Sequence, residues 1–288
     1  QIRLPRMVLA LVVGAGLGLG GALMQGVFRN PLADPGLIGV SSGGALAASL
    51  FIVFAGGLTS DVGGWVRLMG TPVMAFAGAL GVTYLVWHLG TVGGRVLVSR
   101  LLLAGIAINA LAGAAIGCLT LVATDTELRD LIFWSLGSLN GATWTTVLMS
   151  ALGVLPAVLL APRLARSLDA WLLGEVEAQH LGVDVVQLKR RAVGVTALAV
   201  GTAVAAAGII GFVGLVIPHM IRLLLGPGHR YLLPGSALLG AWLLMGADVF
   251  ARLVASPLEI PIGVVTALVG APFFLLLLRR NEDAGLVE

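Results

Sequence analysis

Few side chains in this sequence are arranged for catalysis. Gly39-Val40-Ser41-Ser42-Gly43 matches G-x-S-x-G, the pattern that holds a nucleophilic serine in many hydrolases, and His88 or His219 is a candidate base. The pattern needs a strand, a sharp turn and a helix, whereas this copy begins a long apolar segment. We therefore interpret its small residues as helix-packing positions, with an intramembrane serine hydrolase as the alternative.

Metal and nucleotide chemistry are not expected on this chain. Its four histidines include no pair spaced four residues apart, and Cys118 is the lone cysteine. The single lysine, Lys189, lies between Leu188 and Arg190, so it cannot belong to a G-x-x-x-x-G-K-[ST] phosphate loop. We expect no cofactor here, and any ATP and Mg²⁺ that power the protein must be bound by another chain.

The longest polar segment between apolar stretches is 163–191. In a chain with so few charges, such a segment favours a docking surface for a soluble partner, and a solvated loop without a partner is the alternative. Within it, Glu177-Ala178-Gln179-His180-Leu181-Gly182 has the form E-A-x-x-x-G.

The elements that position these residues are membrane helices. Charged residues make up 11% of the chain and hydrophobic residues 58%, too little charge to cover a water-facing surface. Long charge-free runs, without the alternation of a β-barrel, instead match the roughly 20 apolar residues that cross a bilayer as a helix. A soluble enzyme, a disordered chain and a nucleic-acid binder are thereby excluded. The nine predicted spans are 7–27, 36–57, 68–90, 100–123, 144–162, 192–208, 212–225, 233–253 and 260–278.

Two long apolar runs need further division. Gly208, Gly211, Gly214 and Pro218 split the run 192–221 into two spans. Thr124 and Glu127 form a possible capping box, which predicts a short interfacial helix over 127–139 before the next span.

The first predicted span carries a cluster of glycines. Small residues at G-x-x-x-G spacing let helix backbones approach closely in lipid. Packing within the chain is the favoured interpretation, and a dimer face is the alternative. The glycines are Gly14, Gly16, Gly18, Gly20 and Gly21.

The arginines predict the orientation. Five of the 17 basic residues fall on one side of the nine spans, and the other 12 fall on the side predicted to be cytoplasmic. The C-terminus is then cytoplasmic and Gln1 lies outside, which suggests that a first span is missing and that the native protein has ten. The five external residues are Arg3, Arg6, Arg67, Arg129 and Arg252.

A set of short motifs from Arg3 to Leu278 resembles the type II ABC importer permeases for cobalamin, iron-siderophores and haem. They are Arg3-Leu4-Pro5-Arg6, Gln25, Asn30-Pro31-Leu32-Ala33-Asp34-Pro35-Gly36, Ser99-Arg100-Leu101-Leu102-Leu103-Ala104-Gly105, Leu173-Gly174-Glu175, the 177–182 sequence, Gly211-Phe212-Val213-Gly214-Leu215-Val216-Ile217-Pro218-His219, Ala247-Asp248, Ala251-Arg252 and Glu259-Ile260-Pro261-Ile262-Gly263-Val264-Val265-Thr266.

The resemblance implies an all-α polytopic membrane protein of ten spans. The chain would be one permease domain over 1–288, with inverted repeats near 7–123 and 192–278 and a cytoplasmic coupling segment at 163–191. Two copies would form a homodimer in the bacterial inner membrane. Two ATPase subunits would bind below, and a periplasmic substrate-binding protein would dock above.

The resemblance also implies roles for individual residues. The external Arg3, Arg6 and Arg252 would meet glutamates of the binding protein, and the alternative is that they anchor helix ends. A second group would contact the ATPase: Glu175, Glu177, Ala178 and Gly182.

Three further residues would belong to the translocation pathway. Val98 and Ser99 would form the cytoplasmic gate, although Val98 is more apolar than the usual residue. After Arg100 at its start, Asn109 is the most polar residue of the span 100–123, and it would either line the pathway or form an interhelical hydrogen bond. Asp248 would be structural, with a proton relay as the alternative.

The predicted function is therefore an ATP-driven importer permease for a metal chelate. Haem is the preferred substrate, ahead of ferric siderophores and cobalamin, because the motifs resemble the haem-uptake branch most. A secondary transporter is the rival from another class, and it does not account for the coupling-type sequence at 177–182.

Overall fold

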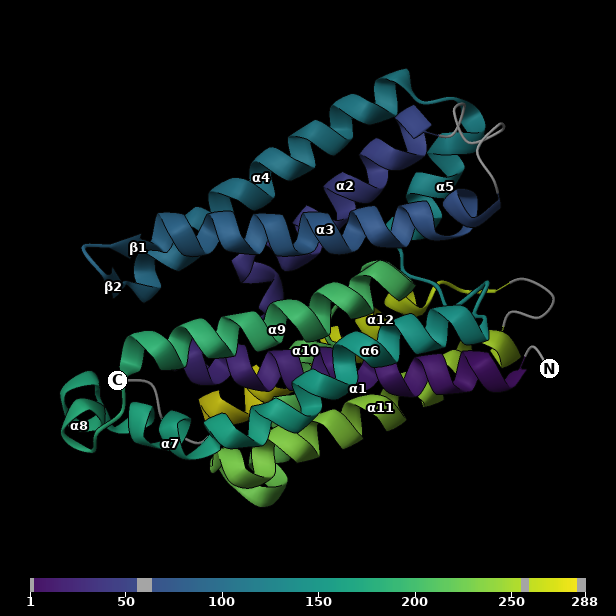
Figure 1. Ribbon diagram of the computed structural model, residues 1–288. Helices are drawn as coiled ribbons and strands as arrows, with labels where there is room; N and C mark the ends of the chain where they lie inside the picture. Colours follow the sequence, from purple (N-terminus) through teal and green to yellow (C-terminus); the bar gives the residue numbers. More distant parts are fainter. Residues whose placement is uncertain (1–2, 56–63, 255–258, 284–288) are drawn as a thin grey trace.

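The fold is a bundle of helices in two layers. The computed structural model describes residues 3–55, 64–254 and 259–283. Figure 1 shows α2, α3, α4 and α5 in one layer and α1, α6, α9, α10, α11 and α12 in the other, and contacts of α9 with α2 and α3 join them. The elements are α1 (Arg3–Phe28), η1 (Pro35–Ile38), α2 (Val40–Ala55), α3 (Gly64–Gly90), β1 (Thr91–Val92), β2 (Arg95–Val96), α4 (Val98–Val122), α5 (Asp125–Ser135), α6 (Trp144–Leu160), η3 (Ala161–Leu164), α7 (Ala165–Leu173), α8 (Glu175–His180), α9 (Val185–Ala207), α10 (Val213–Leu225), α11 (His229–Val254) and α12 (Ile262–Asp283).

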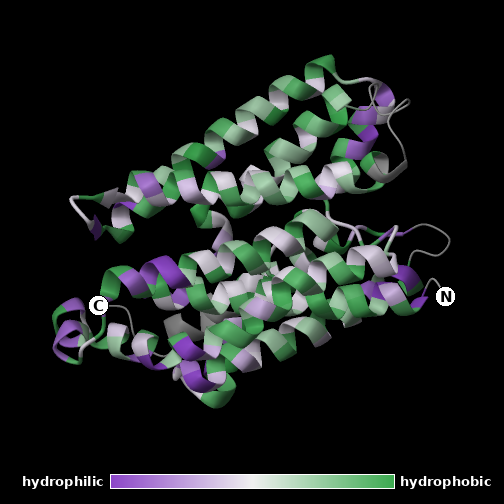
Figure 2. Ribbon diagram, viewed as in Figure 1, coloured by the Kyte–Doolittle hydropathy of each residue, from purple (hydrophilic) through white to green (hydrophobic). Residues whose placement is uncertain are grey.

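Each of the nine predicted spans has a corresponding helix. In the described part of the chain, six helices are long and apolar enough to cross a membrane, and three shorter apolar helices account for the rest. The shorter ones are α2, α10 and the segment Ile262–Leu275 of α12. In Figure 2 the hydrophilic residues gather toward the two ends of the bundle, and the middle of the helices is mainly hydrophobic.

Helix α1 is the central helix of its layer, packed against α6, α9, α10 and α11. A Cβ on Gly14 would overlap the Gly240 carbonyl oxygen, and one on Gly18 would overlap that of Ser236. The backbones of α1 and α11 therefore touch, and the prediction that these glycines serve packing within the chain is confirmed. Helix α1 falls in the predicted repeat 7–123, but it packs in the layer that contains the other predicted repeat, 192–278.

The predicted breaks lie close to those in the structure. Helix α9 ends at Ala207, before Gly208 with φ 71°, and α10 begins after Phe212, which adopts φ 68°. The capping box is present, since Thr124 accepts from the Glu127 backbone N–H and Glu127 accepts from that of Thr124. It starts α5 at Asp125, and the helix ends at Ser135 rather than at 139.

The predicted start of the span 192–208 is wrong. Helix α9 already begins at Val185, inside the polar segment 163–191. Asp184 caps this helix by accepting from the Gln187 backbone N–H at 2.9 Å. The spanning helix therefore extends past the apolar run, and Lys189 lies in its second turn.

Candidate functional site

Apart from Asn109 in the middle of α4, the predicted functional residues lie at the two ends of the bundle, called here the α8 end and the Arg6 end. The α8 end contains α7, α8, the β1–β2 hairpin and the start of α4 (Figure 1). The Arg6 end contains the start of α1 and the end of α11. Residues predicted to lie on one side of the membrane are found at one end, in agreement with the alternation of spans.

The predicted coupling segment 163–191 includes two short helices, α7 and α8, separated by Gly174, which adopts φ 141°. Glu175 and Glu177 are exposed, whereas Ala178 is buried and its carbonyl accepts from Val183 N–H at 2.9 Å. Gly182 follows with φ 80° and turns the chain toward α9. Helix α8 thus presents an acidic surface and anchors itself through Ala178.

Helix α7 is fixed to the bundle through one buried side chain, Trp171, and one partly exposed side chain, Asp169. The Trp171 indole N–H donates to the Val27 carbonyl at 3.1 Å, at the end of α1. Asp169 accepts from the His229 backbone N–H at 2.9 Å and lies 2.7 Å from the His229 ring Nδ1. Local sequence pattern does not predict these contacts, because the partners are 144 and 60 residues apart along the chain.

The predicted gate residues lie at the start of α4, at the same end of the bundle as α7 and α8 (Figure 1). Val98 is the first residue of α4 and is partly buried, and Ser99 next to it is exposed. The short β1–β2 hairpin precedes them and pairs Thr91 with Val96. The predicted gate residues and the predicted coupling residues therefore share one end of the molecule.

Asn109 forms the interhelical hydrogen bonds that were one of its two predicted roles. Its amide Nδ2 donates to the Gly36 carbonyl at 3.1 Å, and its Oδ1 accepts from the Ser42 hydroxyl. Both bonds hold α4 against η1 and α2, so the amide is directed at neighbouring helices. The other predicted role, lining the translocation pathway, stays a prediction.

The Arg6 end contains a cluster of ion pairs. Arg6 Nε donates to Asp248 at 2.8 Å, and its Nη1 donates to Asn140 at 2.9 Å and to Glu259 at 3.0 Å. Arg252 lies 2.9 Å from the second carboxylate oxygen of Asp248. The Arg6 guanidinium holds the pKa of Glu259 below its ordinary value, chiefly through the hydrogen bond between them.

This cluster corrects the prediction for Arg6. Its side chain is 11% exposed and bound to three partners, so it is not displayed for docking. Arg3 is exposed, and Arg252 keeps 28% of its side chain exposed. Asp248, paired with two arginines, has the structural role predicted for it.

The hydrolase alternative finds no support in the site geometry. Within the described residues no hydrogen bond joins Ser41 to a histidine, and Ser42 bonds to Gly39 and Asn109. His219 instead lies against Phe273 and Phe274. Among the residues the structure describes, no group of three or more His, Cys, Asp or Glu side chains is placed to hold a metal ion.

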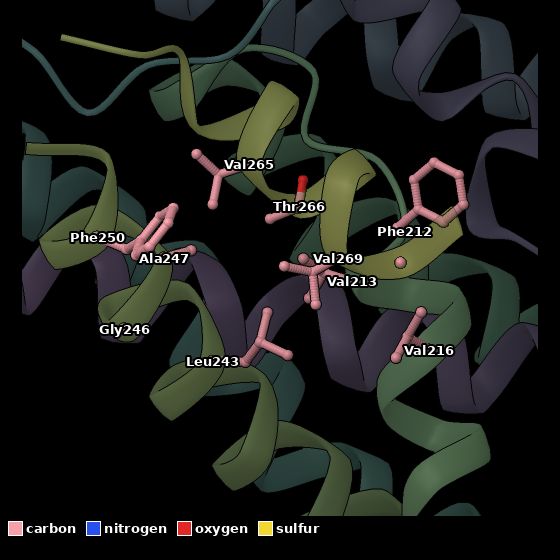
Figure 3. Close-up of a pocket in the computed structure, with 11 residues that line it drawn as sticks. Phe212, Val213, Val216, Leu243, Gly246, Ala247, Phe250, Val265, Thr266 and Val269 are labelled. Carbon is pink, nitrogen blue, oxygen red and sulfur yellow. The ribbon is translucent and has the colours of Figure 1, made fainter. Parts of the chain in front are cut away.

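A cavity of about 240 Å³ lies between α10, α11 and α12. Figure 3 shows Leu243 and Phe250 of α11, Val265 and Val269 of α12 and residues at the start of α10 around it. Of its lining residues only Thr266 has a polar side chain, and that hydroxyl donates to the Gly263 carbonyl. The cavity is apolar and offers no ligand to a metal chelate.

Comparison with known proteins identifies the family. The model of the FecCD transport family matches residues 1–280. The chain belongs to the FecCD transport family. The hemin transport system permease protein HmuU of Yersinia pestis is 48% identical over 283 residues, covering 98% of this chain and 83% of that protein. The cobalamin import system permease protein BtuC of Halobacterium salinarum is 45% identical over 284 residues, 98% of this chain and 73% of that protein.

A solved structure shares the fold. An inward-facing conformation of a putative metal-chelate type ABC transporter superposes with a TM-score of 0.88 at 35% identity, covering 97% of this chain and 86% of that one. The FecCD chain described here is therefore a multi-pass membrane permease of the ABC importer type, with the type II fold. Its family members are permease subunits rather than enzymes.

Proposed function

We propose that this FecCD permease carries haem into the cell, driven by a separate ATPase. The observation that supports haem is the 48% identity to a hemin permease across nearly the whole chain. Cobalamin is the second candidate, because cobalamin permeases are 45% and 41% identical over similar lengths. A ferric siderophore is the third.

The ATPase partner is proposed to bind α8. The exposed Glu175 and Glu177 offer it charge, and the buried Ala178 fixes the helix to the permease, so a push on α8 moves the chain around it. Gly182 permits the turn into α9 because its φ of 80° is costly for other residues. ATP and Mg²⁺ would be bound by the partner, since this chain has no phosphate loop.

The pathway is proposed to run along α4, between two copies of the chain. Only 17% of the apolar window of α4 is buried within one copy, compared with 72% for α1. A second copy facing α4 would enclose a path between them, as expected for a symmetric homodimer. Val98 and Ser99 would form its gate at the α8 end.

The substrate-binding protein is proposed to dock at the Arg6 end. Arg3 and Arg252 supply exposed positive charge there. Charged rims steer docking and fix its register more than they add affinity. With the binding protein outside, the α8 end and the C-terminus are cytoplasmic and the membrane is the bacterial inner membrane.

The decisive experiment is reconstitution in proteoliposomes with the cognate ATPase and binding protein. Haem, a ferric siderophore and cobalamin are supplied separately, and uptake is measured with ATP, without ATP and with vanadate. We expect vanadate-sensitive uptake of haem. Uptake of cobalamin or the siderophore instead would refute haem, and uptake that needs no ATPase would favour a secondary transporter. Labelling of Ser41 by a fluorophosphonate would favour the hydrolase.

A further inference from the structure

The only lysine of the chain lies buried at the α8 end. Lys189 is 3% exposed and sits in the second turn of α9. A buried ammonium is costly unless it finds partners. Its Nζ donates to the Val96 carbonyl at 3.1 Å, lies 3.8 Å from a Glu175 carboxylate oxygen and lies 4.2 Å from the centre of the Trp171 ring.

These three partners belong to three separate elements. Val96 ends β2 and stands two residues before α4, where the gate begins. Glu175 is the first residue of α8, and Trp171 belongs to α7. One ammonium group therefore contacts the coupling segment and the strand that leads into the gate helix.

The contacts differ in strength. The bond to Val96 is buried and within normal hydrogen-bond distance, whereas Glu175 is half exposed and farther away. Trp171 is immobilised by its bond to Val27 and by Arg29, whose guanidinium lies 3.8 Å from the ring centre. The lysine is thus firmly joined to β2 and more loosely joined to α8.

We propose that Lys189 is a positioning residue that transmits movement of α8 to the start of α4. When the ATPase displaces α8, the Glu175 carboxylate shifts relative to the ammonium. The ammonium then moves, or releases, the Val96 carbonyl and the gate residues that follow it. This inference rests on the proposed function, because it assigns α8 to the ATPase and the start of α4 to the gate.

The test uses the full permease–ATPase complex in proteoliposomes. Cys118→Ser removes the native cysteine, and Leu97→Cys introduces a reporter next to Val96, where the leucine is 44% exposed. The measurement is the rate of labelling by a water-soluble maleimide, without nucleotide and after trapping with ATP and vanadate. This ratio needs no transport substrate, so it does not depend on haem.

In the reporter protein we expect nucleotide to change the labelling rate by about five- to tenfold, a size usual for coupling between two sites. Lys189→Met keeps an apolar stem and should bring the ratio toward one, while the ATPase still co-purifies. Lys189→Arg retains the cation and should recover most of the ratio. Arg190→Gln, an exposed neighbour on α9, is the matched control and should behave as the reporter protein.

A labelling ratio in Lys189→Met equal to that of the reporter protein would overturn the inference. The inference would also be overturned if Lys189→Arg assembles with the ATPase but recovers no more of the labelling ratio than Lys189→Met does. If the Lys189→Met permease does not assemble with the ATPase, the Glu175→Gln variant provides the test, because it leaves the hydrogen bond from Lys189 to Val96 intact. It should lower the ratio in part, and an unchanged ratio would overturn the link to α8. A parent complex that binds no ATPase would instead refute the proposed function.

Discussion

Removal of Arg6 tests the ion-pair cluster most directly. Arg6→Met keeps the apolar stem and removes the guanidinium that binds Asp248, Glu259 and Asn140. Breaking a buried pair by removing one partner costs about 3–5 kcal/mol. The Asp248 side chain is 1% exposed but keeps Arg252 at 2.9 Å, so we expect the lower end, about 3 kcal/mol.

The assay is unfolding in mixed micelles by added SDS, followed by tryptophan fluorescence. Arg3→Met is the matched control, because Arg3 is exposed on the same helix, and it should change the unfolding free energy by less than about 0.5 kcal/mol. The double variant Arg6→Met/Asp248→Leu removes the stranded carboxylate and should be more stable than Arg6→Met alone. Arg252 and Glu259 are partly exposed and remain solvated in it.

Two results would refute the reasoning. If Arg6→Met unfolds with the same free energy as Arg3→Met, the cluster does not stabilise the fold. If the double variant is less stable than Arg6→Met alone, the cost does not come from an uncompensated buried carboxylate.

Four further predictions concern packing, pH, docking and coupling. Gly14→Ala should destabilise by about 1–3 kcal/mol because its Cβ meets a facing backbone, whereas Gly113→Ala, with open space around it, should be neutral or stabilising in the same SDS titration. Because the pKa of Glu259 is lowered in the folded protein, its ionised carboxylate stabilises the fold at any pH above the ordinary pKa of 4.5. This stabilisation is lost as the pH falls through the lower folded-state pKa. Glu259→Gln should therefore flatten the loss on acidification, and an unchanged pH profile would count against the pair. Arg3→Glu should weaken association with the binding protein at low salt, measured by titration, and equal affinity would remove that residue from the docking surface. Gly182→Pro cannot adopt φ 80° and should lower substrate uptake per ATP hydrolysed, which an unchanged ratio would contradict.

The structure gives the two ends of the bundle different kinds of contact. At the Arg6 end, one arginine ties α1 to α11 and to the side chains of Asn140 and Glu259. At the α8 end, Lys189 and Trp171 join α7, α8, β2 and the end of α1. A buried charge needs partners, and Arg6 and Lys189 both find theirs on other elements.

The sequence by itself determined the class, the spans and their alternation. The length of an apolar run is enough to predict a membrane helix. Gly208 and the capping box at Thr124 set helix ends through contacts within a few residues, so the local sequence was sufficient to predict those ends. The family motifs also predicted which segments would face an ATPase and a binding protein.

Only the tertiary structure decided which charges are displayed and which are buried. Arg3 and Arg6 look alike in the sequence and lie on the first turn or so of the same helix, but packing against α11 pairs Arg6 with Asp248, 242 residues away, and leaves Arg3 exposed. Lys189 likewise appeared as part of a polar segment, and it is buried because α9 begins early and β2 supplies an acceptor 93 residues away. Pairing across such distances depends on how helices pack, and the spacing of residues along the chain does not contain it.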